Sequence, residues 1–158
     1  MRNLKTMFSL LLLVTALATG CKKDEDGPGS GNSKYVYQGT TTEITAAKFF
    51  NVAVLGTNVM NIVLTGEGTS KNLQLFFYKG STSIPVGTFT YKDNSSASYN
   101  PANNFSGGSI KLDIPTSHEI TGGTVAISKD GDNYAINLDA QTSRGPVTAT
   151  YHGKITPQ

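Results

Sequence analysis

Two histidines and a few carboxylates are the side chains in this sequence that acid–base or metal chemistry would require. His118 and His152 lie far apart, and the chain has no Gly-x-Ser-x-Gly motif that would mark a serine nucleophile. We expect His118 in a turn and His152 on the polar face of a strand, in both cases without a catalytic role. Two histidines with no further ligand at a suitable spacing predict no metal site, and the sequence assigns no residue to a cofactor.

A pair of carboxylates is the remaining catalytic possibility, because glycoside hydrolysis uses two of them on either side of the scissile bond. The candidates are Glu43, Glu67, Asp113, Glu119 and Asp139. The sequence brings no two of them together, and acidic residues are mostly solvated. A small hydrolase is therefore kept as an alternative, and no catalytic residue is assigned.

Cys21 is the only cysteine in the chain, and it follows a segment with the three parts of an export signal. Arg2 and Lys5 are basic, residues 8–17 are apolar, and small residues stand at 18–20. The apolar run of about ten residues is too short to span the hydrocarbon of a bilayer. Ala-Thr-Gly directly before Cys21 resembles the lipobox of bacterial lipoproteins. That resemblance implies cleavage before Cys21 and attachment of diacylglycerol to its thiol.

The residues after Cys21 predict a flexible tether and a sorting signal. Lys23-Asp24-Glu25-Asp26 resembles the surface-export signal of Bacteroidetes lipoproteins, which implies an outer-membrane protein that faces the cell exterior. Residues 27–33 are rich in Gly and Ser, which is typical of a flexible linker. We therefore expect a signal peptide at 1–20, the lipidated cysteine and tether at 21–33, and one domain at 34–158.

The charge of the mature chain argues against one class of partner. Of the 13 Lys and Arg residues, Arg2 and Lys5 belong to the signal, which leaves eleven against eleven Asp and Glu. A neutral domain lacks the basic face that nucleic-acid binding requires. The membrane, through the lipid anchor, is the partner that the sequence does predict.

Strand-forming residues dominate from Lys34 onward, with Gly, Asn, Asp and Pro between the runs. Apolar and polar residues alternate, which indicates strands with one face in a core and one in water. The clearest alternating runs are 60–64, 73–77, 110–114, 134–139 and 147–155. About eight to ten strands without helices predict an all-β antiparallel meander. A calycin-like barrel is favoured over a two-sheet sandwich, although alternation fits both.

Three stretches resemble a pattern of small Bacteroidetes lipoproteins whose domain is rich in β-structure. They are residues 84–91 (IPVGTFTY), 120–125 (ITGGTV) and 150–155 (TYHGKI). The resemblance covers roughly the C-terminal half of the chain. It implies the fold class and carries no catalytic residue.

One hairpin can be predicted in register. Asp130-Gly131 suits the two central positions of a type I′ turn, where both residues need positive φ. This turn gives apolar pairs on one face of the hairpin and a charge pair beside the turn. The predicted pairs are Lys129 with Asp132, Ile127 with Tyr134, and Val125 with Ile136.

Three segments depart from regular alternation. Gly122-Gly123 separates apolar residues of opposite parity, which predicts a β-bulge. Residues 42–55 fit a strand or a short helical turn, and we favour the strand. Residues 93–108 are rich in Asn, Ser and Gly, and predict a long polar loop of a kind that is often functional or disordered.

The mouth of a barrel is the default place for a ligand. The aromatic residues expected to line it are Tyr37, Phe77, Tyr91 and Tyr151, although a filled core explains them equally well. The leading hypothesis is a non-catalytic surface domain that binds a small ligand, a glycan or an envelope protein. Besides the hydrolase, a structural or adhesive subunit that uses exposed β-edges remains an alternative, and the oligomeric state is open.

Overall fold

The computed structural model describes residues 33–68, 70–79, 82–112 and 116–158. The predicted signal peptide, Cys21 and the tether up to residue 32 lie outside this part of the chain. All regular structure in the described residues is β, in eleven strands. These are β1 (Lys34–Tyr37), β2 (Thr40–Val54), β3 (Thr57–Gly66), β4 (Asn72–Tyr78), β5 (Gly87–Tyr91), β6 (Asn104–Phe105), β7 (Gly107–Lys111), β8 (Ser117–Asp130), β9 (Asn133–Thr142), β10 (Gly145–Gly153) and β11 (Thr156–Pro157).

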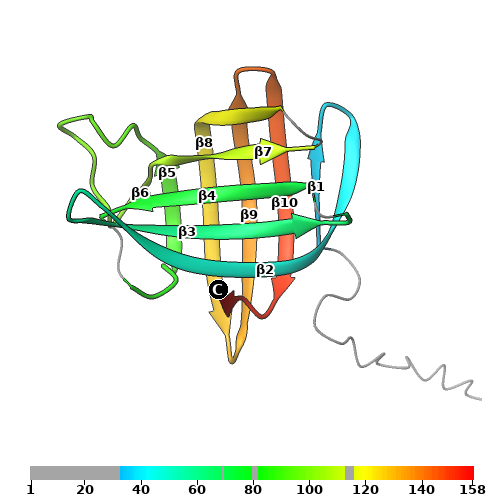
Figure 1. Ribbon diagram of the computed structural model, residues 1–158, viewed down its shortest axis with the longest axis horizontal. Helices are drawn as coiled ribbons and strands as arrows, with labels where there is room; N and C mark the ends of the chain where they lie inside the picture. The colour runs from blue at the N-terminus through cyan, green and yellow to red at the C-terminus, as the bar shows by residue number, and fades with distance from the viewer. Residues whose placement is uncertain (1–32, 69, 80–81, 113–115) are drawn as a thin grey trace, which may run out of the picture.

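Eight of these strands close into an antiparallel barrel (Figure 1). The order around the barrel is β8-β7-β4-β3-β2-β1-β10-β9, and pairing between β8 and β9 closes it. Strands β5, β6 and β11 lie outside this ring, where β5 pairs with β8 and β11 runs parallel to β2. The predicted all-β fold with a calycin-like barrel is confirmed.

The alternating side chains fill the interior of the barrel. Met60, Ile62 and Leu64 of β3 are fully buried, as are Leu73 and Leu75 of β4. Polar residues of the same strands, such as Gln74, stand on the outer face. The interior is thus a packed core, as in small eight-stranded barrels.

The hairpin between β8 and β9 corrects one prediction. Its two-residue loop is Gly131-Asp132, so Asp130 pairs with Asn133 and Ile127 pairs with Ile136. The predicted register was wrong by two positions, whereas the predicted inward face is the observed one. Gly131 has a φ of 56° and Asp132 has no positive φ, which is the pattern of a type II′ turn with Gly first.

Gly131 supplies a test of this turn. We expect Gly131→Val to lower the free energy of unfolding by about 1–2 kcal/mol, because a β-branched residue is strained at positive φ. A Cβ at this position meets nothing within 4 Å, so the loss measures backbone strain alone. Thermal unfolding should show a midpoint several degrees lower. Gly31→Val, in the tether, should leave the midpoint unchanged, and equal midpoints for both variants would refute the turn.

The predictions for the three irregular segments have different outcomes. The pairing of β8 with β9 shifts between Ile120 and Gly122, so the predicted bulge is present, but its extra residue is Thr121, directly before the predicted Gly122-Gly123. The strand favoured for 42–55 is confirmed as β2, which ends at Val54. The predicted loop of 93–108 is wrong at its end, because β6 and the start of β7 lie there. Phe105 is fully buried in the core, which draws this part of the chain into the sheet.

Candidate functional site

Along one of its edges, strand β8 pairs with two different strands. Strand β7 pairs with residues 117–120 of β8, and β5 pairs with residues 124–127. Among the described residues, no strand pairs with residues 121–123 on this edge. The β-bulge between Ile120 and Gly122, with Thr121 as the extra residue, lies in the same interval. A notch therefore opens in the wall of the barrel where β5 and β7 part.

A groove of about 440 Å³ lies beside this notch. It is lined by Phe76, Tyr91, Asp93, Ser106, Gly107, Gly108, Ser109, Ser117, Glu119, Ile120 and Thr121. Two aromatic rings, two carboxylates and five hydroxyl groups, including that of Tyr91, thus line one volume, and Gly107 and Gly108 leave part of its lining without side chains. None of these described lining residues is Lys, Arg or His. The groove therefore suits a polar ligand that is neutral or cationic.

The loop between β5 and β6 contributes Asp93 to the groove and is held by its own side chains. The Asp93 carboxylate accepts hydrogen bonds from the Ser95 backbone N–H at 2.8 Å and from its hydroxyl at 2.6 Å. These bonds lower the pKa of Asp93, so the group is ionised at neutral pH. The Tyr99 hydroxyl donates to the carbonyl of Tyr78 at 2.9 Å, and burial raises the pKa of Tyr99. This contact fastens the loop to β4.

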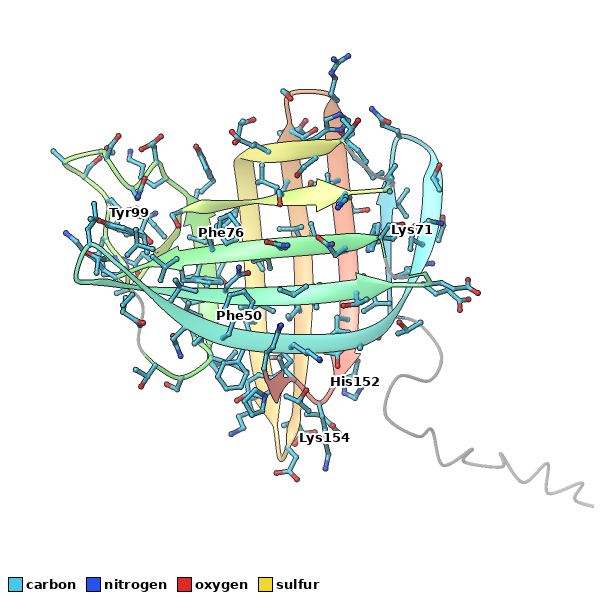
Figure 2. The ribbon with its side chains drawn as sticks, viewed as in Figure 1. Phe50, Lys71, Phe76, Tyr99, His152 and Lys154 are labelled. Carbon is cyan, nitrogen blue, oxygen red and sulfur yellow. The ribbon has the colours of Figure 1, made fainter. Side chains whose placement is uncertain are left out.

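A row of outward side chains extends from the groove across the barrel wall. Phe50 of β2 pairs with Asn61 of β3, Asn61 pairs with Phe76 of β4, and Phe76 pairs with Gly107. Figure 2 shows Phe50 and Phe76 on this outer face. Asn61 is 9% exposed, and its Oδ1 has no hydrogen-bond partner among the described residues. The aromatic lining of the groove is thus continuous with a partly apolar outer face, in which the Asn61 Oδ1 is itself buried.

The structure does not gather the four aromatic residues predicted to line a barrel mouth. Tyr37, Phe77 and Tyr151 are buried in the core, at 1%, 2% and 4% exposure. Tyr91 is half-buried and lines the groove, with its ring against Phe105. A ligand-binding role for the three core residues stays a prediction.

His118 was expected in a turn but lies in β8, where it takes part in a buried network. Its Nδ1 is 2.6 Å from the hydroxyl of Tyr37, which is 3.1 Å from the Thr142 hydroxyl. Thr142 in turn donates to the carbonyl of Gly145 at 2.8 Å and accepts from the Arg144 N–H at 3.0 Å. The network ties β1 and β8 to the turn between β9 and β10. His152 is exposed on β10, as its strand position predicted.

Of the carboxylates singled out in the sequence, Glu119 alone lines the groove, and Asp113 lies outside the described residues. Asp93 was not among those candidates, because its loop position carries no motif. In the described part of the chain, no three His, Cys, Asp or Glu residues are grouped to hold a metal ion. The same residues contain no helix long and apolar enough to cross a membrane.

The comparisons with known proteins found no relative of this chain. No protein-family model matches the chain, and no curated protein or solved structure is significantly similar to it.

Proposed function

We propose that this protein is an outer-membrane lipoprotein, anchored through Cys21 and facing the cell exterior, whose non-catalytic domain binds a neutral glycan. The groove beside the notch in β8 is the proposed binding site. The observation that carries the proposal is its lining, in which aromatic rings, hydroxyls and carboxylates stand together without a cation. The Lys/Asp/Glu stretch at 23–26 supports the outward orientation, through its resemblance to the surface-export signal.

The groove offers both kinds of contact that a sugar ring makes. The apolar face of a pyranose packs on an aromatic ring, for which Tyr91 and Phe76 are available. Its hydroxyls donate hydrogen bonds to carboxylates, for which Asp93 and Glu119 are available. A few convergent polar groups beside apolar surface are the usual composition of a small-molecule site. An anionic ligand is disfavoured because it would meet two acidic side chains.

The chemistry of the same groove disfavours the hydrolase alternative. A glycosidase needs one carboxylic acid that stays protonated, and therefore a raised pKa at one member of the pair. The pKa of Asp93 is instead lowered by its hydrogen bonds with Ser95. Glu119 is exposed to solvent on the outer face of β8. We therefore assign the two carboxylates to binding.

The position of Ser33 agrees with a domain that is attached to the lipid anchor through a short tether. Its carbonyl accepts a hydrogen bond from the Ile44 N–H at 2.8 Å, and its hydroxyl accepts one from the His152 N–H at 3.0 Å. Ser33 is thus bonded to the domain, and residues 22–32 are the linker that we propose. A flexible chain of that length spans roughly 20 Å on average.

The groove is tested by filling it. In a soluble chain that begins at Lys22, Ser109→Trp should place an indole in the groove from the outer face and abolish glycan binding. Glu119→Gln should weaken binding about five- to tenfold, because it removes a charge-assisted hydrogen bond. Binding is measured by calorimetry against a panel of neutral and anionic oligosaccharides, after native mass spectrometry of the purified protein for a retained ligand.

Asp139→Asn is the matched control, because Asp139 is an exposed carboxylate on β9 outside the groove lining. It should bind as the wild type does. The proposal is wrong if Ser109→Trp and Glu119→Gln retain full affinity, or if anionic oligosaccharides bind more tightly than neutral ones.

A further inference from the structure

One edge of β2 is only partly paired. Strand β1 pairs with residues 40–43 and β11 with residues 48 and 49, both on the side of β2 that faces away from β3 (Figure 1). Beyond them, no strand among the described residues pairs with residues 50–54 on this edge. The segment is still paired with β3 on its other side. The barrel therefore carries an open edge at the end of its longest strand.

The backbone groups that point outward from this edge can be identified. The N–H of Gln158 donates to the carbonyl of Phe49 at 2.9 Å, so the peptide groups of Phe49 face the open side. Peptide groups alternate in direction along a strand, so those of Asn51 and Ala53 face the same way. The hairpin loop Leu55-Gly56 agrees with this assignment, because the residues next to a two-residue loop bond to each other. Among the described residues, the outward N–H and C=O groups of Asn51 and Ala53 have no backbone partner, while the Asn51 side chain donates to the carbonyl of Thr82 at 3.1 Å.

The side chains along this edge lack the usual protection. Val52 is 42% exposed, Val54 is 48% exposed, and Leu55 at the hairpin tip is fully exposed. No charged residue occurs between Lys48 and Glu67. Natural proteins shield open edges with charges, proline or bulges, because an apolar open edge pairs with other strands. An unshielded edge of this kind marks a surface for strand addition.

We propose that the occupant of this edge is the same edge of a second copy of the protein, paired antiparallel about a twofold axis at Val52. In that register Asn51 of each copy lies opposite Ala53 of the other. Every outward N–H and C=O of these two residues then finds a partner, because such residues exchange both of their hydrogen bonds. The edge is complementary to itself, as a twofold interface requires.

The side chains agree with this register. Phe50, Val52 and Val54 stand on the outer face of β2, since Phe49 and Asn51 pair with the inward residues Ile62 and Met60. Val52 then lies beside Val52 of the second copy, and Phe50 lies beside Val54. The pairing removes exposed apolar surface from water and brings no charges together.

Five residues a copy make a small contact, so the pair is expected to be weak in solution. Attachment to one membrane would strengthen it, because tethered partners meet at an effective concentration in the millimolar range. The register itself needs no anchor, so it can be tested on the soluble domain. Its outcome can also be told apart from that of the groove, because none of residues 50–54 lines the groove.

The experiment uses the chain from Lys22, which contains the whole closed barrel. Sedimentation equilibrium should show the mean mass rising toward that of a dimer between about 10 µM and about 1 mM. Over the same range, amide hydrogen exchange should slow about fivefold at Asn51 and Ala53. The exchange of Val52 and Val54 should stay constant, because their N–H groups already bond to β3.

Two variants separate this edge from other surfaces. Ala53→Pro removes an outward N–H while leaving the ladder to β3 intact, and Val52→Lys places like charges beside each other. Each should weaken association at least about tenfold. Val86→Lys is the control, because Val86 is 56% exposed and outside the edge, and it should associate as the wild type does. A wild-type chain that stays monomeric up to about 1 mM overturns the proposal, as does association that survives in both variants.

Discussion

Ile136→Ala is expected to lower the free energy of unfolding by about 2–5 kcal/mol, the range for truncating a fully buried aliphatic side chain. Ile136 has no exposed surface and lies between Ile127 of β8 and Tyr151 of β10. Because the barrel interior is packed, the truncation leaves a cavity that its neighbours fill only in part. Urea titration followed by circular dichroism measures the loss.

Asn137→Ala is the matched control, since Asn137 is the next residue on the same strand and stands exposed on the outer face. Its effect should stay within about 0.5 kcal/mol. The comparison tests the inward and outward assignment of β9 directly. A neutral Ile136→Ala together with a destabilising Asn137→Ala would show that the faces are inverted.

Cys21→Ser is expected to abolish recovery of the protein from the outer membrane. The acyl chains that we propose at Cys21 contribute about 0.8 kcal/mol for each buried methylene, which makes a multiply acylated anchor stable. Serine cannot form the thioether that holds them. The measurement is fractionation of cells, with metabolic labelling by a fatty acid to follow the modification.

The control replaces residues 23–26 with alanine and leaves Cys21 in place. This variant should keep its label and its membrane fraction, but should lose exposure to protease added to whole cells. If Cys21→Ser remained in the outer membrane, the lipid anchor would be refuted. Equal protease exposure in wild type and the alanine variant would reduce residues 23–26 to plain linker.

The class of the fold could be predicted because its signal is local. Alternation along 147–155 gives the inward face of β10 without knowledge of any partner strand, and the structure confirms it. The register of the β8–β9 hairpin could not be predicted as securely. Asp130-Gly131 and Gly131-Asp132 both satisfy a two-residue turn, and the two choices keep the same residues inward. The sequence pattern therefore could not separate them.

The candidate site could not be predicted, because long-range pairing assembles it. Phe76 and Gly107 are far apart in the sequence and meet through the ladder between β4 and β7. Asp93 reaches the groove on a loop that is fastened by Tyr99 and Tyr78. Single residues of these types carry no motif. Tyr91 was singled out for its aromatic side chain alone, and it lines the groove only because β5 and β7 part there.

The pairing of β1 also constrains when the domain can fold. Lys34, near the start of the domain, pairs with Thr150, near its end, so barrel closure joins residues more than a hundred positions apart. In the export that we propose, the N-terminal end of the domain would emerge first. Strand β1 would then be present before its partner β10, whereas β8, β9 and β10 pair with near neighbours in the sequence. The long sequence separation of β1 and β10 would keep the barrel open until export is nearly complete.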